Sequence, residues 1–187
     1  MAKKEHNTGN LSPEFALMGF LIEKPCHGYD LHQRLTTELG QVWHLSQSQA
    51  YAILKRLETR GDISARMVAQ EKLPARQMLH ITASGRKRFF AWLETEISTT
   101  ARSVRLEFLT RLYFANLYRP EIISQIYQSQ LSEIDTKIEK LETLIENLSP
   151  EQTYNHLSLD LRLRQMKLIQ SWMAEIKTQF HISRIEK

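Results

Sequence analysis

The chain has 187 residues, a net charge of +4 and one cysteine, Cys26. A single cysteine excludes an internal disulfide framework and fits a reducing compartment. We find no secretory signal at the start and no apolar run of about 18 residues, so we expect a cytoplasmic protein without a membrane span. Six glycines and five prolines are few for this length, which favours long helices over a sandwich or barrel.

The first half of the chain predicts three short helices. Ser12 and Pro13 begin the first, which ends at the Lys24–Pro25 step, because a residue before proline avoids helical dihedrals. The second opens at Gly28–Tyr29–Asp30 and stops at Gly40. Ser46 caps the third, residues 47–60, in which we expect Tyr51, Leu54 and Leu57 to form an inward stripe.

The periodicity then changes from helical to alternating. Residues 63–68, with Ile63, Ala65 and Met67 on one side, predict a strand, and residues 78–83 predict a second. The polar stretch between them predicts an exposed hairpin tip, and Thr82 begins a further helix. Three helices, a hairpin and a helix are typical of a winged helix-turn-helix domain, which we assign to residues 1–97.

Residues 98–187 are purely helical in pattern. Apolar side chains recur at alternating spacings of four and three from Tyr127 to Leu148, and a second, wider apolar face runs from Leu159 to Phe180. The two helices can pair as an antiparallel hairpin within one chain. The width of the second face favours a homodimerisation domain instead. The expected interface residues are Leu131, Ile134, Ile138, Leu141, Leu163, Met166, Ile169, Trp172, Met173 and Ile176.

The third helix carries side chains suited to reading double-stranded DNA. Serine and glutamine bond base edges, and lysine and arginine hold phosphates. A hairpin tip beside this helix can add phosphate or minor-groove contacts. The candidate DNA-binding residues are Ser46, Gln47, Ser48, Gln49, Tyr51, Lys55, Arg56, Lys72 and Arg76.

The positive charge is concentrated around these candidates. Residues 43–90 hold nine lysines and arginines against three acidic residues, whereas residues 96–187 are neutral overall. Clustered cations gain affinity for nucleic acid by releasing its counterions. A winged-helix protein-interaction adaptor is the alternative, and binding to random duplex DNA that is absent at low salt would favour it.

Three segments resemble the PadR family of bacterial transcriptional regulators. These are residues 11–35 with His-Gly-Tyr-Asp-Leu at 27–31, residues 46–63 with the Tyr51 to Gly61 pattern, and residues 79–93. The resemblance implies a dimeric regulator, mostly a repressor, that binds an inverted repeat, and some members release DNA on binding a phenolic acid. Two departures are Ala52, where the family usually has proline, and Gln77–Met78–Leu79, where an aromatic residue is often found.

Catalytic and cofactor motifs are absent from the sequence. The seven histidines form no HxxxH or HExxH pair, one cysteine cannot build a zinc thiolate site, and no glycine-rich phosphate loop occurs. We therefore expect no enzyme, no metal and no cofactor. Aromatic residues near the expected domain junction suggest a site for a small aromatic effector, formed by Trp43, Phe90, Trp92 and Phe108.

Overall fold

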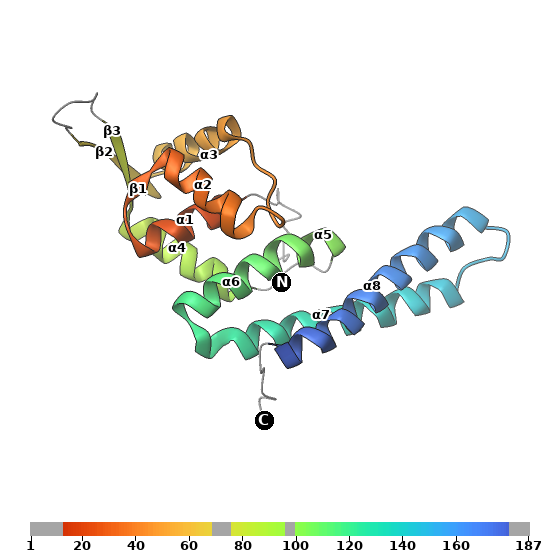
Figure 1. The fold of residues 1–187 in the computed structure, drawn as a ribbon. Helices are drawn as coiled ribbons and strands as arrows, with labels where there is room; N and C mark the ends of the chain where they lie inside the picture. The colour runs from red at the N-terminus through yellow and green to blue at the C-terminus, as the bar shows by residue number, and fades with distance from the viewer. Residues whose placement is uncertain (1–12, 69–75, 96–99, 180–187) are drawn as a thin grey trace, which may run out of the picture. The chain divides into compact units, whose positions relative to one another are not determined.

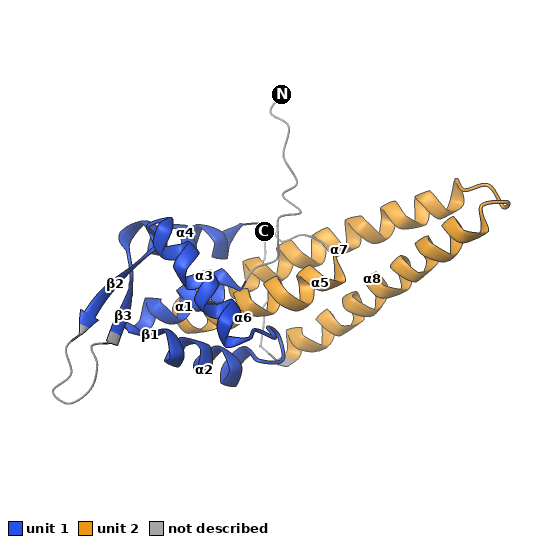
Figure 2. Ribbon diagram, turned by 90° about the horizontal axis from the view of Figure 1, so that it is seen from above, with its two compact units in different colours: residues 1–95 blue, residues 96–187 orange. Residues whose placement is uncertain are grey.

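The computed structural model describes residues 13–68, 76–95 and 100–179. The chain divides into two compact units, residues 1–95 and residues 96–187 (Figure 2). Both are mainly helical, and the first also contains a small antiparallel sheet. None of the helices within the described ranges is long and apolar enough to cross a bilayer.

Unit 1 is a winged helix-turn-helix domain, as the sequence predicts (Figure 1). Its hairpin of two longer strands projects beyond the helices in this view. In chain order its elements are α1 (Glu14–Glu23), β1 (Cys26–His27), α2 (Gly28–Leu39), α3 (Gln47–Thr59), β2 (Ile63–Val68), β3 (Arg76–Ile81) and α4 (Ala83–Glu94).

Local signals explain where α3 begins and ends. The Ser46 hydroxyl accepts a hydrogen bond from the Gln49 backbone N–H (3.3 Å), and the Gln49 side-chain oxygen accepts one from the Ser46 N–H (2.9 Å). This reciprocal capping box satisfies two donors that the first helical turn leaves unpaired. Beyond the other end, Gly61 adopts a φ of 77°, a left-handed conformation that glycine reaches without a steric cost.

The sheet contains a strand that the sequence did not reveal. β1 pairs with β3 through Cys26 opposite Leu79 and His27 opposite Met78, so the sheet order is β1-β3-β2. The second predicted strand lies two residues earlier than expected, because Thr82 caps α4 instead of continuing the strand. Met67, expected on the inward side, is exposed.

The core of unit 1 is formed by apolar residues from all four helices. Leu17, Leu31, Leu57 and Phe89 are buried almost completely. The predicted inward stripe of α3 is wrong at Tyr51, because this residue is 46% exposed. The buried face of α3 instead contains Ala50, Ile53, Leu54 and Leu57, which recur every three or four residues, whereas Tyr51 lies about 100° around the helix from Ala50.

Buried carboxylates tie the elements of unit 1 together. Glu14 on α1 pairs with Arg56 (3.5 Å), Arg60 (3.3 Å) and Arg88, and Asp62 pairs with Arg88 (2.6 Å) and Arg60 (3.7 Å). Both carboxylates are largely removed from solvent, so each depends on its arginine partners. The network joins α1, α3, the start of β2 and α4.

Residues 100–179, the described part of unit 2, form helices and no strand. Its elements are α5 (Ala101–Ser103), the π-helical turn η1 (Val104–Phe108), α6 (Leu109–Tyr118), the 3₁₀ turn η2 (Pro120–Ile122), α7 (Ile123–Glu146) and α8 (Thr153–Gln179). The two long helices lie side by side in Figures 1 and 2. They form an antiparallel hairpin, one of the two arrangements that their apolar faces allow.

Polar contacts fix the register of this hairpin. The Tyr127 hydroxyl donates to the Met173 backbone oxygen (2.9 Å), and the Gln170 amide donates to Asp135 (2.7 Å). Lys167 also forms an ion pair with Glu142 (2.7 Å). A hydrogen bond from a buried hydroxyl favours this one register over a shift of the apolar seam.

Most of the predicted interface residues lie in the seam between α7 and α8 of the same chain. Six are buried, and the other four are half-buried. The buried six are Ile134, Ile138, Leu141, Met166, Met173 and Ile176, and the half-buried four are Leu131, Leu163, Ile169 and Trp172. Other apolar residues on the outside of the hairpin are exposed instead, namely Leu144, Tyr154, Leu157, Leu161 and Leu168.

Candidate nucleic-acid interface

The first turn of α3 presents a polar, exposed surface. Ser46, Gln47, Ser48 and Gln49 are all exposed. The capping box occupies the Ser46 hydroxyl and the Gln49 side-chain oxygen, so these two side chains stabilise the helix start. The side chains of Gln47 and Ser48 make no hydrogen bond with any residue that the structure describes, which leaves both to a ligand.

The two neighbouring basic residues of α3 have different surroundings. The Lys55 side chain is exposed, and its ammonium pairs with no described carboxylate. Arg56 instead joins the buried network through Glu14. Sequence alone treats the two as equivalent phosphate contacts, whereas the structure gives Arg56 a partner within the fold.

The predicted wing contacts are only partly described. Lys72 lies outside the described residues, and Arg76 is described by its backbone alone, in β3 opposite Val68. A residue that sequence reasoning did not single out is Arg66 on β2, which is exposed and pairs with Met78 on β3. Its position in a strand of the hairpin would have been the signal.

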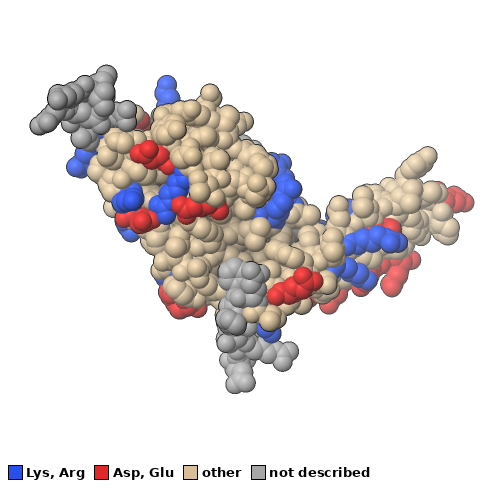
Figure 3. Space-filling view, in the orientation of Figure 1, with Lys and Arg blue, Asp and Glu red and all other residues tan. Residues whose placement is uncertain are grey.

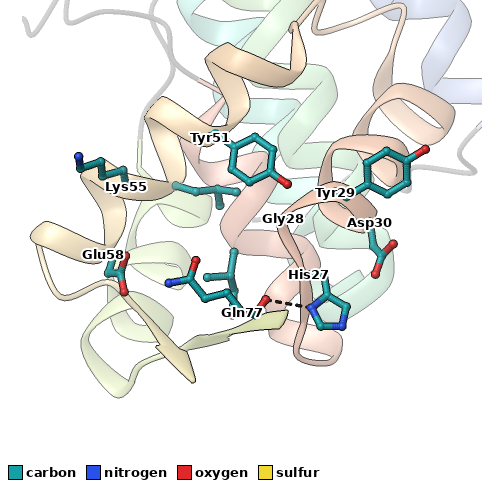
Figure 4. A pocket seen from close by; sticks show the side chains of 10 residues that line it. His27, Gly28, Tyr29, Asp30, Tyr51, Lys55, Glu58 and Gln77 are labelled. Atoms are coloured by element: carbon teal, nitrogen blue, oxygen red, sulfur yellow. Dashed lines mark hydrogen bonds between the residues drawn. The ribbon is translucent and has the colours of Figure 1, made fainter. Parts of the chain in front are cut away.

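An open groove of about 810 Å³ crosses the exposed side of α3 (Figure 4). The first turn of α2 and strand β3 form its other walls, and Tyr51, Lys55 and Glu58 line it from α3. Sequence reasoning did not find this groove, because its walls come from segments some 20 to 50 residues apart.

Strand β1 contributes His27 to the groove, and Cys26 precedes it in the chain. The His27 Nδ1–H donates to the Gln77 backbone oxygen (2.9 Å) and holds β1 against β3. Next to it, burial and then the charge of Asp30 raise the pKa of the Cys26 thiol to about 11. A thiol with so high a pKa is a poor nucleophile at neutral pH.

On the side of unit 1 that Figure 3 shows, the positive charge concentrated in the sequence does not form a uniformly positive surface. In the view of Figure 3, basic and acidic side chains alternate over unit 1. Three arginines of the basic stretch are in the network with Glu14 and Asp62. The cations left to an anionic partner are therefore individual side chains such as Lys55 and Arg66.

The four predicted effector-binding aromatics have partners within their own units. In unit 1, Trp43 is buried, Phe90 is half-buried beside Phe89 (5.3 Å between ring centroids), and Trp92 stacks on Phe15 (4.5 Å). In unit 2, Phe108 is fully buried and meets Trp172 edge to face (6.4 Å). These contacts are those of ordinary core aromatics.

Comparisons with known proteins agree on one family. Residues 17–91 match the model of the Transcriptional regulator PadR-like family. The chain is similar to the Negative transcriptional regulator PadR of Bacillus subtilis (strain 168), with 27% identity over 172 residues that cover 87% of this chain and 94% of that protein.

Solved structures of Bacillus subtilis PadR are also similar. One, in complex with operator DNA, is 29% identical, covers 89% of this chain and 98% of its own, and gives a TM-score of 0.43. Another, in complex with p-coumaric acid, is 26% identical, covers 97% of this chain and all of its own, and gives a TM-score of 0.41. The winged-helix unit of this chain therefore matches the model of the PadR-like family of transcriptional regulators, and the sequence similarity to Bacillus subtilis PadR extends over most of the chain.

Proposed function

We propose that the protein is a repressor that binds an inverted-repeat operator as a homodimer. Residues 1–97 bind DNA and residues 98–187 dimerise. The observation that carries this proposal is the outer face of α3, on which Gln47 and Ser48 are exposed and make no hydrogen bond with a described residue, with exposed Lys55 two turns later. Side chains of these types read bases and hold phosphates. The curated relative's name, a negative transcriptional regulator, supports repression.

The homodimer forms through the outer face of α8 in this proposal. Tyr154, Leu161 and Leu168 are spaced seven residues apart, and all three are exposed. Apolar residues repeated every seven positions form the seam of a helical pair, and burying them against a second copy removes them from water. A two-fold axis then gives two copies of α3 to the two halves of an inverted repeat.

A small aromatic acid is the effector class that we assign to this protein. The compound to test is p-coumaric acid, with which a solved structure of Bacillus subtilis PadR is in complex. Binding should raise the melting temperature and weaken operator binding. No effect on either across a small set of planar aromatic acids would contradict this assignment.

The experiment on function uses the DNA upstream of the gene. A duplex carrying an inverted repeat from that region is compared with a random duplex of equal length, by fluorescence anisotropy at several salt concentrations. We expect tighter binding to the inverted repeat, by at least a thousandfold at physiological salt, and a steep salt dependence for both. Absence of binding to either duplex at low salt would point instead to the protein-interaction adaptor.

A further inference from the structure

One buried carboxylate of unit 1 pairs with arginines of α3, the helix that we propose binds DNA. Glu14 is the first residue of α1. Its Oε2 accepts a hydrogen bond from Nη2 of Arg56 (3.5 Å), and its Oε1 accepts one from Nη1 of Arg60 (3.3 Å). Arg56 and Arg60 are four residues apart, so they lie on the same side of α3. The two cations therefore converge on one anion within the fold.

Arg88 on α4 holds this anion in position. Its Nη2 donates to Oε1 of Glu14, its Nη1 donates to Asp62 (2.6 Å), and its guanidinium lies 4.8 Å from the centre of the Phe15 ring. Glu14 and Asp62 are both buried. An ion pair whose carboxylate is already fixed and largely removed from water loses less side-chain entropy and is screened less than one formed on the surface. Glu14 can therefore compete with an approaching phosphate for the two arginines of α3.

The same two arginines remain accessible to solvent. The side chains of Arg56 and Arg60 are 49% and 42% exposed. Arg56 directly follows Lys55 and lies about 100° further around the helix. An arginine at such a position, once released from its carboxylate, can turn outward and hold a phosphate. The two arginines can thus pair either with an anion of the protein or with an anion of DNA.

We propose that Glu14 is an intramolecular competitor of DNA phosphate, which occupies Arg56 and Arg60 and thereby limits the affinity of the protein for DNA of any sequence. The inference rests on the proposed DNA binding. Phosphate contacts supply most of the nonspecific affinity and carry no sequence information. Each arginine that Glu14 keeps from the DNA backbone removes about one such contact, so binding depends more on the base contacts of the first turn of α3.

The test measures binding to a labelled random-sequence duplex of about 30 base pairs, at about 50 to 200 mM salt. Glu14→Gln removes the charge of the competitor and keeps its size. The matched control is Glu23→Gln, at the last residue of the same helix, which removes an exposed carboxylate from Arg34. Arg34 keeps its second partner, Glu38 (2.5 Å), so the control leaves this arginine paired.

A second comparison removes the arginines themselves. Arg56→Gln and Arg60→Gln are introduced together, once in the wild-type chain and once in the Glu14→Gln chain. Because both arginines are about half exposed, the wild-type fold tolerates their loss. Circular dichroism checks that each variant is folded.

We expect the two sets of substitutions to depend on each other. Glu14→Gln steepens the slope of log affinity against log salt by about one to two units and tightens binding about tenfold, whereas Glu23→Gln changes both little. Removing the arginines returns the Glu14→Gln chain to wild-type affinity and slope. In the wild-type chain the same removal lowers the slope by less than about half a unit, because Glu14 already holds both cations. A purely structural role of Glu14 would weaken binding, and loss of the arginines would not reverse it.

Two kinds of result overturn two different statements. If the wild-type protein fails to bind the duplex at about 50 mM salt, the proposed DNA-binding function is wrong, and the competitor assignment is wrong with it. If the wild-type protein binds, and Glu14→Gln gains no more affinity than Glu23→Gln or keeps its gain without the arginines, the competitor assignment alone is wrong. A loss of about two slope units on removing the arginines from the wild-type chain also contradicts it, because both would then hold phosphates in spite of Glu14. This last comparison decides the matter even where Glu14→Gln does not fold.

Discussion

At the scale of single residues, neighbouring positions of one helix serve different ends. Lys55 is exposed without a described carboxylate partner, whereas Arg56, the next residue of α3, forms an ion pair with Glu14 on α1. Periodicity in sequence does not distinguish them, because the carboxylate that separates their roles lies about 40 residues earlier in the chain. Ion pairs between residues far apart in the chain leave no local sequence pattern, so they are the part of this site that sequence predicts least well.

Arg88 makes the closest contacts of the buried network, because it lies nearer to both Glu14 and Asp62 than Arg60 does, the other arginine that pairs with both. Replacing it, Arg88→Met, leaves two buried carboxylates short of a cation, which costs about 3 kcal/mol of the free energy of unfolding. Urea denaturation measures this loss, and Lys55→Gln is the control that should leave stability unchanged. Equal stability of the Arg88 and Lys55 variants would mean that the network contributes little to stability.

Cys26 offers a second measurement at the same scale. With a pKa of about 11, its thiolate fraction at pH 8 is far below that of an ordinary cysteine, so alkylation by iodoacetamide should be about a hundredfold slower than in the unfolded chain. The rate should rise nearly tenfold per pH unit from pH 8 to pH 10. Mass spectrometry reads this directly, since the chain has one cysteine. A rate that levels off below pH 9 would show that the thiol is not desolvated.

At the scale of elements, the capping box at the start of α3 divides its polar residues into two groups. Ser46 and Gln49 satisfy each other's backbone groups, while Gln47 and Ser48 are left for a partner. Both glutamines are exposed and adjacent to the same turn. Their substitutions should therefore have different consequences.

Gln47→Ala should reduce the preference for operator over random DNA by about tenfold, because an amide that bonds a base edge is lost. Gln49→Ala should instead lower the free energy of unfolding by about 1 kcal/mol, because the capping box is lost. Anisotropy with both duplexes and urea denaturation of both variants separate the two effects. If Gln49→Ala alone abolishes discrimination, the roles of the two glutamines are reversed.

Helix starts and strand periods made most of unit 1 predictable, because they are local. Ser46, Thr82 and Gly61 mark element ends in the sequence as in the structure. Strand β1 was not predictable, since two residues show no period and pair only when β3 is present. Tyr51 was assigned to the wrong face because an aromatic side chain resembles a core residue, whereas its exposure and its seat on Gly28 appear only in three dimensions.

At the scale of the whole molecule, the sequence left open whether the apolar faces of α7 and α8 pack against each other in one chain or against a second copy. Spacings of three and four predict that α7 and α8 need partners but do not say whether the partner belongs to the same chain. The structure places the seam that holds Ile134 and Met173 inside the α7–α8 hairpin. The exposed residues of α8 therefore form a separate face, and two variants distinguish the roles of the faces.

Replacing both Leu161 and Leu168 with glutamate should convert a dimer into a folded monomer. The two residues are 58% and 71% exposed in the single chain, so charges at these positions leave the core of the hairpin intact. Ile138→Asp should instead destabilise the chain by several kcal/mol, because it places a charge in the buried seam. Gln165→Glu, at an exposed polar position of α8, controls for added charge. Light scattering after gel filtration gives the mass, and circular dichroism gives the helix content.

A double glutamate variant that stays dimeric at micromolar concentration would exclude the outer face of α8 as the contact between copies. A monomeric wild-type protein would exclude the homodimer, and with it the matching of two α3 helices to an inverted repeat.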